Sequence, residues 1–246
     1  YLDFGNQTLD NGKGFWVNYP GGGAGSISYI EWGKLLIANV SPEKNTYGEQ
    51  PNYIYWAGVA GQSGYENRTE CSSFVTRLLL QSYPGLNIGT WLGYPGATNP
   101  NAAKYHDAIV NQTGLQAVAG LTDLRAGDLI AIKYPAGGSS SGHLMIALGG
   151  LRAREASAPL IASPAGQTYA QYEVDVMDSA NSGHGYTDTR YLGNNTWNDG
   201  AGIGVLRIYT DASGQIAGYT WSTRVTSAAY FYSQDVNHLV IGRPQL

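Results

Sequence analysis

Residues 70–85 have the sequence ECSSFVTRLLLQSYPG, which carries the clearest helix signal in the chain. Pro84 and Gly85 end the run, because proline cannot supply a backbone donor and glycine favours a turn. The apolar residues that recur at the spacing of one helical face are Phe74, Val75, Leu78 and Leu79. This segment therefore predicts an amphipathic helix that packs on the rest of the fold.

Cys71 falls in the first turn of that helix and shares the face of Phe74 and Val75. Asn67 or Thr69 can cap the helix start. The partial positive charge at a helix N-terminus stabilises a thiolate, and the free backbone N–H groups there can bind an oxyanion. Since Cys71 is the single cysteine of the chain, it forms no internal disulfide. The alternative is that Cys71 is a small buried hydrophobe.

Helical patterns come first along the chain and strand patterns follow, an order typical of the α+β class. An aromatic stretch without a clear period, residues 47–65, separates two of the helices. We expect one domain over residues 1–246, in which residues 1–64 form an N-terminal extension of helix and loop. Further helices are expected at 28–40 and 102–111, and strands at 128–134, 142–148, 171–178, 204–210, 215–221 and 238–242.

Two polar residues stand on apolar faces of predicted strands. His143 lies at the start of the strand 142–148, directly after a Gly/Ser loop. We expect the strand to hold its side chain in a fixed position with access to a cleft. Asp178 ends the strand 171–178 on the face of Val174 and Val176, where a carboxylate can orient an imidazole. Alternatively, loop carbonyls satisfy His143, and Asp178 starts a turn before the segment 181–183.

Three short motifs follow one another along the chain: ECSSFV at 70–75, LRAGDLI at 124–130 and GHLMIA at 142–147. In this order they resemble the NlpC-type branch of the papain-like cysteine peptidases. The resemblance implies a papain-like α+β fold, with the cysteine helix packed on an antiparallel sheet of about five to six strands. It also implies Cys71 as nucleophile and His143 as general base and later acid. Asp178 takes the third position, where relatives commonly carry His, Asn or Gln.

The resemblance also implies side chains that assist the oxyanion or bind substrate. A tyrosine upstream of the cysteine often does so, and Tyr65 is our candidate, with Tyr53 and Tyr55 as alternatives. Ser72, next to the nucleophile, belongs to the same predicted group.

Residues 178–190 form a polar, glycine-punctuated segment that can make one wall of a substrate cleft. Here His184 is a second histidine, and Arg190 is expected to meet a substrate carboxylate. A solvated connecting loop is the alternative. A metal site built from Asp178, His184 and Asp188 is conceivable, yet no metal-ligand motif supports it, so we expect no metal and no cofactor.

The amino-acid composition argues against some classes of binding partner. The net charge is −4 and no Lys/Arg run occurs, which argues against a nucleic-acid surface. No stretch reaches the roughly 18 apolar residues that a membrane span needs. The start at Tyr1 and the glycine- and tyrosine-rich composition predict a bacterial secreted or periplasmic protein whose signal peptide has been removed.

Together these observations predict a monomeric cysteine hydrolase that cleaves an amide through a thioester, in a peptide or peptidoglycan-like substrate of the bacterial cell wall. Three alternatives remain open. One is a catalytically silent glycan- or peptidoglycan-binding domain, a second is a metal-dependent hydrolase using His184 and Asp188, and a third is an acyltransferase with the same Cys71–His143 pair.

Overall fold

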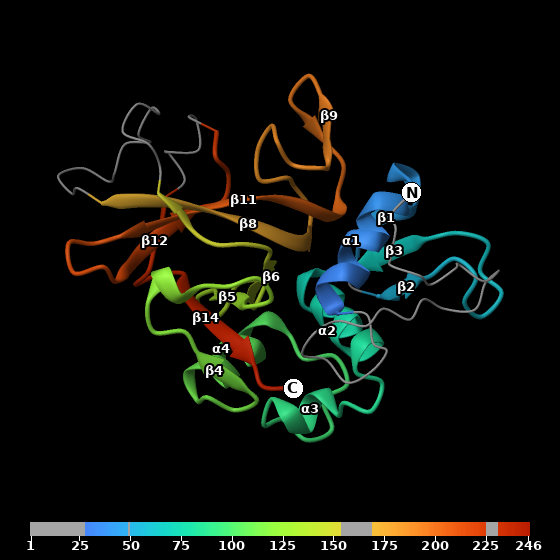
Figure 1. Cartoon of the computed structure of the whole chain (residues 1–246), viewed down its shortest axis with the longest axis horizontal. Helices are drawn as coiled ribbons and strands as arrows, with labels where there is room; N and C mark the ends of the chain where they lie inside the picture. Colours follow the sequence, from blue (N-terminus) through green and yellow to red (C-terminus); the bar gives the residue numbers. More distant parts are fainter. Residues whose placement is uncertain (1–27, 49, 154–168, 225–230) are drawn as a thin grey trace, which may run out of the picture.

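A large antiparallel sheet dominates the computed structural model, which describes residues 28–48, 50–153, 169–224 and 231–246 (Figure 1). It has nine strands in the order β13-β12-β11-β8-β6-β5-β14-β4, with β7 beside β8. The strands are β4 (Leu115–Ala117), β5 (Leu129–Lys133), β6 (Gly142–Ala147), β7 (Arg152–Ala153), β8 (Ala170–Ala180), β11 (Gly200–Thr210), β12 (Ile216–Thr220), β13 (Phe231–Ser233) and β14 (His238–Pro244).

Smaller elements flank this sheet. The helices are α1 (Tyr29–Asn39), α2 (Cys71–Ser82), α3 (Ile88–Trp91) and α4 (Ala102–Val110), with 3-10 turns η1 (Pro42–Lys44) and η2 (Leu121–Asp123). A three-stranded sheet joins β1 (Asn45–Tyr47), β3 (Glu66–Thr69) and β2 (Tyr53–Tyr55), and a two-stranded one joins β9 (Tyr191–Gly193) to β10 (Thr196–Trp197).

The fold class predicted from the sequence is wrong. The expected papain-like α+β arrangement has a cysteine helix on five to six strands, whereas the sheet here has nine strands and the described chain contains little helix. The prediction counted only strands with an apolar run, a clear alternation or a turn signal beside them. Short strands such as β4, β7 and β13 span two or three residues, too few to show a period.

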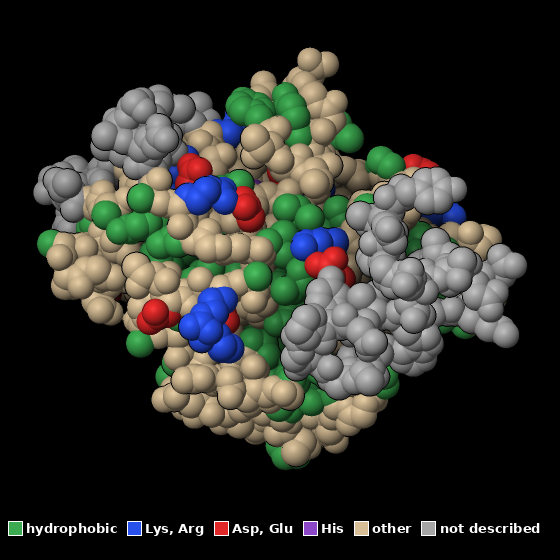
Figure 2. Space-filling view, viewed as in Figure 1, with side chains coloured by type: hydrophobic (Ala, Val, Ile, Leu, Met, Phe, Trp, Pro, Cys, Tyr) green, Lys and Arg blue, Asp and Glu red, His purple; other side chains and the backbone are tan. Residues whose placement is uncertain are grey.

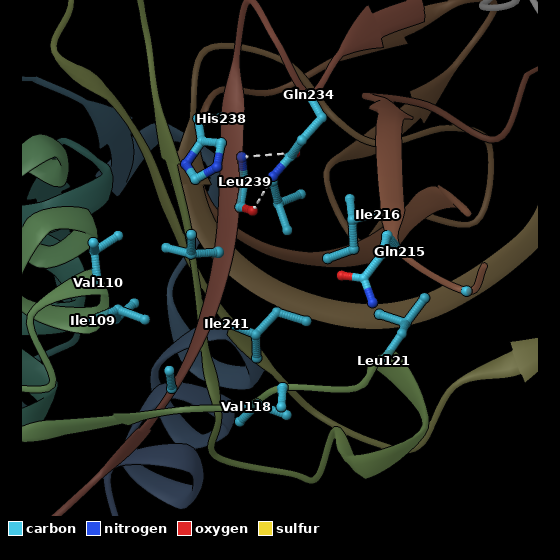
Figure 3. Close-up of a pocket in the computed structure, with 14 residues that line it drawn as sticks. Ile109, Val110, Val118, Leu121, Gln215, Ile216, Gln234, His238, Leu239 and Ile241 are labelled. Atoms are coloured by element: carbon cyan, nitrogen blue, oxygen red, sulfur yellow. Dashed lines mark hydrogen bonds between the residues drawn. The ribbon is translucent and has the colours of Figure 1, made fainter. Parts of the chain in front are cut away.

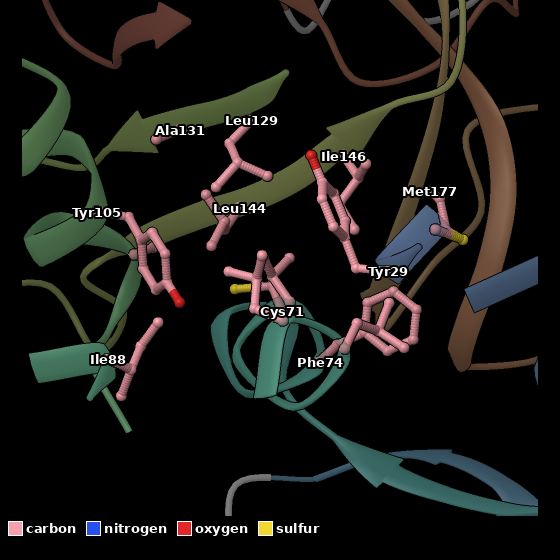
Figure 4. Close-up of a cluster of buried hydrophobic side chains, with 14 of the residues drawn as sticks. Tyr29, Cys71, Phe74, Ile88, Tyr105, Leu129, Ala131, Leu144, Ile146 and Met177 are labelled. Carbon is pink, nitrogen blue, oxygen red and sulfur yellow. The ribbon is translucent and has the colours of Figure 1, made fainter. Parts of the chain in front are cut away.

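Each face of the sheet has its own hydrophobic core. On one face α1, α2 and α4 pack over Leu129, Leu144, Ile146 and Met177 (Figure 4). On the other face the sheet curls over Ile130, Met145, Val176, Leu206 and Ile241. The two faces are called the helix face and the inner face below. Because strand side chains alternate, neighbours along β6 and β8 enter different cores.

The predicted helices are confirmed at close to their expected bounds. Ser28 caps α1, since its side chain accepts a hydrogen bond from the Glu31 backbone. The cap of α2 is Glu70, rather than Asn67 or Thr69, because the Glu70 carboxylate accepts the Ser73 N–H. The aromatic stretch 47–65, expected to be a loop, contains β2 and lies against β3.

Candidate active site

Cys71 lies where two central strands separate. β6 and β8 pair at Ile146–Met177 and Ala147–Val176, and among the described residues the start of β6 has no strand partner on its β8 side. The first turn of α2 fills this gap from the helix face. Cys71 Sγ lies 4.0 Å from the Gly142 carbonyl of β6, and on the β8 side Ser179 Oγ donates to the Thr69 carbonyl at 2.7 Å.

The thiol at this position is less acidic than an ordinary cysteine. Only 2% of Cys71 is exposed, and burial is the main reason that the pKa of its thiol is raised. The Glu70 carboxylate, whose Oε2 lies 3.7 Å from Sγ, raises that pKa further. The backbone N–H groups of Leu144 and Ser72 act in the opposite direction but do not outweigh these two. The expected thiolate is therefore wrong for the resting protein, because the helix terminus is buried together with a carboxylate.

His143 and Asp178 meet on the inner face, as their strand positions predicted. His143 Nε2 lies 2.7 Å from Asp178 Oδ2, and both side chains are buried. Asp178 directly follows Met177, a paired residue of β8, and His143 lies in the part of β6 before Ile146, where the pairing with β8 begins. The hydrogen bond therefore spans the same gap that α2 enters from the helix face. In the described part of the chain, no hydrogen bond occupies the other ring nitrogen, Nδ1.

The gap in the sheet brings Cys71 and His143 together from opposite faces. Cys71 contacts the backbone on both sides of His143, at Gly142 and Leu144, while the His143 ring projects to the inner face with Met145. Among the described residues, the polar partners of Sγ are Glu70, the Ser72 backbone N–H and the β6 backbone, and no hydrogen bond joins Sγ to the imidazole. Cys71 and His143 are thus neighbours that are not joined by a direct hydrogen bond.

Asp178 is the centre of a buried ion-pair network. Its Oδ2 also faces His184 Nε2 at 3.1 Å, and its Oδ1 accepts from Arg190 Nη2 at 2.9 Å. Arg190 also binds Asp188 through Nε and Nη2. Burial alone would raise the pKa of Asp178, but Arg190, His184 and the hydrogen bond from His143 outweigh it and hold that pKa well below its usual range.

This network changes the roles expected for His184 and Arg190. Both side chains are almost fully buried, and the Arg190 guanidinium donates to the Asp178 and Asp188 carboxylates and to the Gly200 carbonyl of its own chain. Arg190 is therefore not placed to bind a substrate carboxylate. The conceivable metal ligands Asp178, His184 and Asp188 do meet, but Arg190 lies between the two carboxylates, and its charge repels a cation.

The predicted oxyanion residues have different positions. Ser72 is buried beside Cys71, its hydroxyl donates to Glu70 Oε1 at 2.8 Å, and its backbone N–H faces the thiol. Tyr65 packs edge-on against Trp56 with ring centroids 6.3 Å apart. Among the described residues, no hydrogen bond links Tyr65 to Cys71 or His143.

A cavity of about 420 Å³ opens on His143 from the inner face. Among the described residues, no Lys, Arg, Asp or Glu lines it; its walls are Tyr47, Tyr134, Ser140, Gly142, His143, Ala180, Asn181, Ser182, Tyr219, Trp221, Ser222 and Tyr232. Cys71 lies just beneath this wall, in contact with Gly142.

The sequence prediction missed the aromatic side chains of this cavity. Burial raises the pKa of Tyr134 to about 12, and the neighbouring Cys71 contributes to that rise. Trp221 stacks on His184 with ring centroids 4.2 Å apart and meets His143 edge-on at 4.7 Å. Tyr134 directly follows β5, the strand paired with β6, so strand pairing was the signal that could have found it.

A second cavity of about 450 Å³ straddles β14 away from these residues (Figure 3). Its walls are mainly aliphatic side chains of α4, β12 and β14, and Gln234 bridges the backbone of Leu239 there. At its edge His238 Nδ1 lies 2.7 Å from His106 Nε2. No Cys, Ser or Thr stands among the described residues that line it.

On the face shown in Figure 2, charged side chains occur in small groups of both signs. Among the described residues, no helix combines the length and the apolar character of a bilayer-crossing segment.

One relative was found among known proteins. The chain is 29% identical over 229 residues to the uncharacterized protein R653 of Acanthamoeba polyphaga mimivirus, an alignment that covers 88% of this chain and 96% of the viral protein. No family model and no solved structure matches the chain. The viral relative has no described activity, so it supports a shared fold without indicating a function.

Proposed function

We propose that this protein is a cysteine hydrolase that cleaves an amide, with Cys71 as nucleophile, His143 as base and Asp178 as the group that orients His143. The observation that carries the proposal is the hydrogen bond from His143 Nε2 to Asp178 Oδ2. It leaves His143 Nδ1 free to accept a proton at the gap between β6 and β8, which Cys71 enters from the helix face. The motif order that resembles the NlpC-type peptidases adds support for the same three residues.

The raised pKa of Cys71 defines how the reaction must begin. The thiol is neutral at rest, so His143 Nδ1 takes its proton as Sγ attacks the carbonyl carbon. The tetrahedral intermediate collapses when the imidazolium returns that proton to the leaving amine, which gives a thioester. Water then attacks the thioester with His143 as base, and the products are a carboxylic acid and the free thiol.

Two donors stand near the place where the oxyanion would form. The Ser72 N–H at the start of α2 already faces Sγ. Tyr134 lines the wall of the His143 cavity. Because its pKa is raised to about 12, its hydroxyl keeps its proton at neutral pH. A buried donor aimed at a developing charge typically contributes about 10²- to 10³-fold in rate.

The residues that line the cavity restrict the chemical class of substrate that can bind there. Its wall combines aromatic faces with the hydroxyl and amide groups of Ser140, Asn181, Ser182 and Ser222. Such a lining suits an uncharged group with apolar faces and hydrogen-bonding edges. We therefore propose that the neutral part of a cell-wall peptide or glycopeptide binds here, while any charged residue of that substrate lies outside the cavity.

Acylation by a p-nitrophenyl ester tests the function without knowledge of the natural substrate. We expect a covalent acyl adduct on Cys71, located by mass spectrometry of proteolytic fragments, and its slow loss in water. Cys71→Ala should show no adduct, and His143→Gln should form it far more slowly. An adduct that resists water but transfers to an added amine would instead identify an acyltransferase.

A second candidate, a catalytically silent binding domain, is favoured by one specific observation. Cys71 is 2% exposed and does not itself line the aromatic cavity, which has the lining of a sugar-binding site. Calorimetry with soluble peptidoglycan fragments on the wild type and Trp221→Ala would show binding by the cavity. Binding without any acylation of Cys71 would favour this candidate over the hydrolase.

A further inference from the structure

Both ring nitrogens of His184 face atoms that can only accept a hydrogen bond. Nδ1 lies 2.7 Å from the carbonyl oxygen of Trp221, and Nε2 lies 3.1 Å from Asp178 Oδ2. A neutral imidazole has one N–H and one lone pair, so it would turn that lone pair against a carbonyl or a carboxylate. An imidazolium donates from both nitrogens and satisfies both acceptors.

We propose that His184 is a buried imidazolium whose charge compensates Asp178, and that it is a positioning residue for His143. His184 then belongs to the charge network of the site and makes no contact with substrate.

Charge counting in the network leads to the same result. The carboxylates of Asp178 and Asp188 are buried with one guanidinium, Arg190. Without a second cation this cluster would carry an uncompensated negative charge in a medium of low dielectric constant, which is costly. A protonated His184 makes the cluster neutral.

The geometry assigns the second positive charge to His184 and not to His143. Each ring donates one hydrogen bond to the same oxygen, Asp178 Oδ2. The second nitrogen of His184 meets the Trp221 carbonyl, whereas Nδ1 of His143 meets no acceptor among the described residues. His143 therefore gains nothing from a second proton and stays neutral, the state that a general base needs.

The stacking of Trp221 fits this assignment. Its ring lies over His184 with centroids 4.2 Å apart and an interplanar angle of 29°. An aromatic face attracts a cation, so the contact stabilises the charged form of His184. The same indole meets His143 nearly at right angles, at 83°, where its edge-to-face contact fixes the ring orientation.

Nitrogen-15 NMR of the histidine rings tests the inference directly on the full-length protein. The chain has four histidines, so Gln variants of His106, His143 and His238 assign the remaining ring by elimination. At neutral pH we expect His184 to show two protonated nitrogens and His143 to show one, at Nε2. A neutral His184 ring with a single N–H would overturn the proposal, whether the missing proton is found on Asp178 or nowhere in the cluster.

His184→Gln tests the positioning role, which rests on the proposed function. Removal of the compensating charge should drive His143 to accept a second proton at neutral pH, visible as a second protonated nitrogen in its spectrum. An unchanged His143 spectrum in a folded variant would contradict the role. Should this variant not fold, the spectrum of the wild type still decides the charge of His184. Failure of the hydrolase proposal would leave these spectra unchanged and would appear only as absent acylation.

Discussion

His143 Nε2 and Asp178 Oδ2 lie 2.7 Å apart on the inner face of the sheet, across the gap where β6 and β8 have separated. The same separation admits the first turn of α2 from the helix face. One irregularity in the sheet therefore brings the His143 imidazole, the Asp178 carboxylate and the Cys71 thiol to one place.

Asp178→Asn should abolish most of the reactivity of Cys71. The amide can present an N–H to His143 Nε2 and so favours the wrong tautomer, in which Nδ1 carries the proton and cannot accept one. In triads of this type the loss of the orienting carboxylate costs up to about 10⁴-fold in rate. Acylation by the p-nitrophenyl ester measures this.

A structural defect could mimic that result, because Asp178→Asn also leaves Arg190 and His184 without their shared partner. Circular dichroism and thermal unfolding provide the control. A folded Asp178→Asn protein that acylates at the wild-type rate would exclude Asp178 as the orienting group.

Glu70→Gln should make the Cys71 thiol more acidic. The Glu70 carboxylate is the second cause of the raised pKa, after burial, and Gln removes its charge but keeps an acceptor for the Ser73 N–H. The alkylation of Cys71 by iodoacetamide should therefore rise at lower pH than in the wild type.

Glu70→Ala is the matched comparison. It removes the same charge together with the helix cap, so it should show the same alkylation shift plus a loss of about 1 kcal/mol in the free energy of unfolding. If the alkylation profile of both variants coincides with that of the wild type, the Glu70 contribution is disproved.

The helix and strand positions were predictable because they rest on local periodicity. α1, α2 and α4 carry strong 3.6-residue patterns, and the alternation of β8 placed Asp178 on the face that meets His143. The sheet order and the extra strands were not predictable, since β4, β7 and β13 are too short to show a period. The acidity of Cys71 was predicted wrongly for a related reason, because the burial of a helix terminus depends on strands more than 70 residues away.

Acid should destabilise the protein in a range set by Asp178. The pKa of Asp178 in the folded state is far below its unfolded value of about 3.9. The ionised Asp178 therefore contributes fully to the free energy of unfolding above the unfolded pKa, and this contribution is lost as the pH falls towards the folded pKa. We expect the free energy of unfolding, measured in guanidinium chloride, to decline below about pH 4.

Asp175→Asn is the control for this pH dependence, because Asp175 forms an exposed ion pair with Arg152. In Asp175→Asn the free energy of unfolding should decline with falling pH as steeply as in the wild type. In a folded Asp178→Asn or Asp178→Ala variant this decline should be smaller. Equal slopes in all variants would contradict the role of Asp178.

Tyr134→Phe should slow acylation while leaving the fold intact. Tyr134 lines the cavity wall, and its hydroxyl, with a pKa of about 12, is a hydrogen-bond donor at neutral pH. Its loss removes one proposed oxyanion donor and should lower the acylation rate about 10²-fold. Tyr232→Phe removes a hydroxyl from the same cavity without this role and should acylate normally. Equal rates in both variants would leave Ser72 N–H as the sole proposed donor.

Gly142→Ala should lower stability strongly. Gly142 has a φ of +144°, and a Cβ there would lie 1.9 Å from the Ile132 carbonyl oxygen, which is backbone and cannot move aside. We expect a loss of more than about 2 kcal/mol in unfolding free energy by chemical denaturation. Gly85→Ala, with no atom within 4 Å of the added Cβ, should be nearly neutral.

The pH dependence of Cys71 alkylation in the wild type and in His143→Gln tests the central claim most directly. If His143 is the base, the wild type should react with iodoacetamide near pH 7 at least about 10²-fold faster than His143→Gln, and the two rates should converge at high pH. Equal rates near pH 7, or a wild-type thiol that does not react at all, would contradict the assignment of Cys71 and His143 as a catalytic pair.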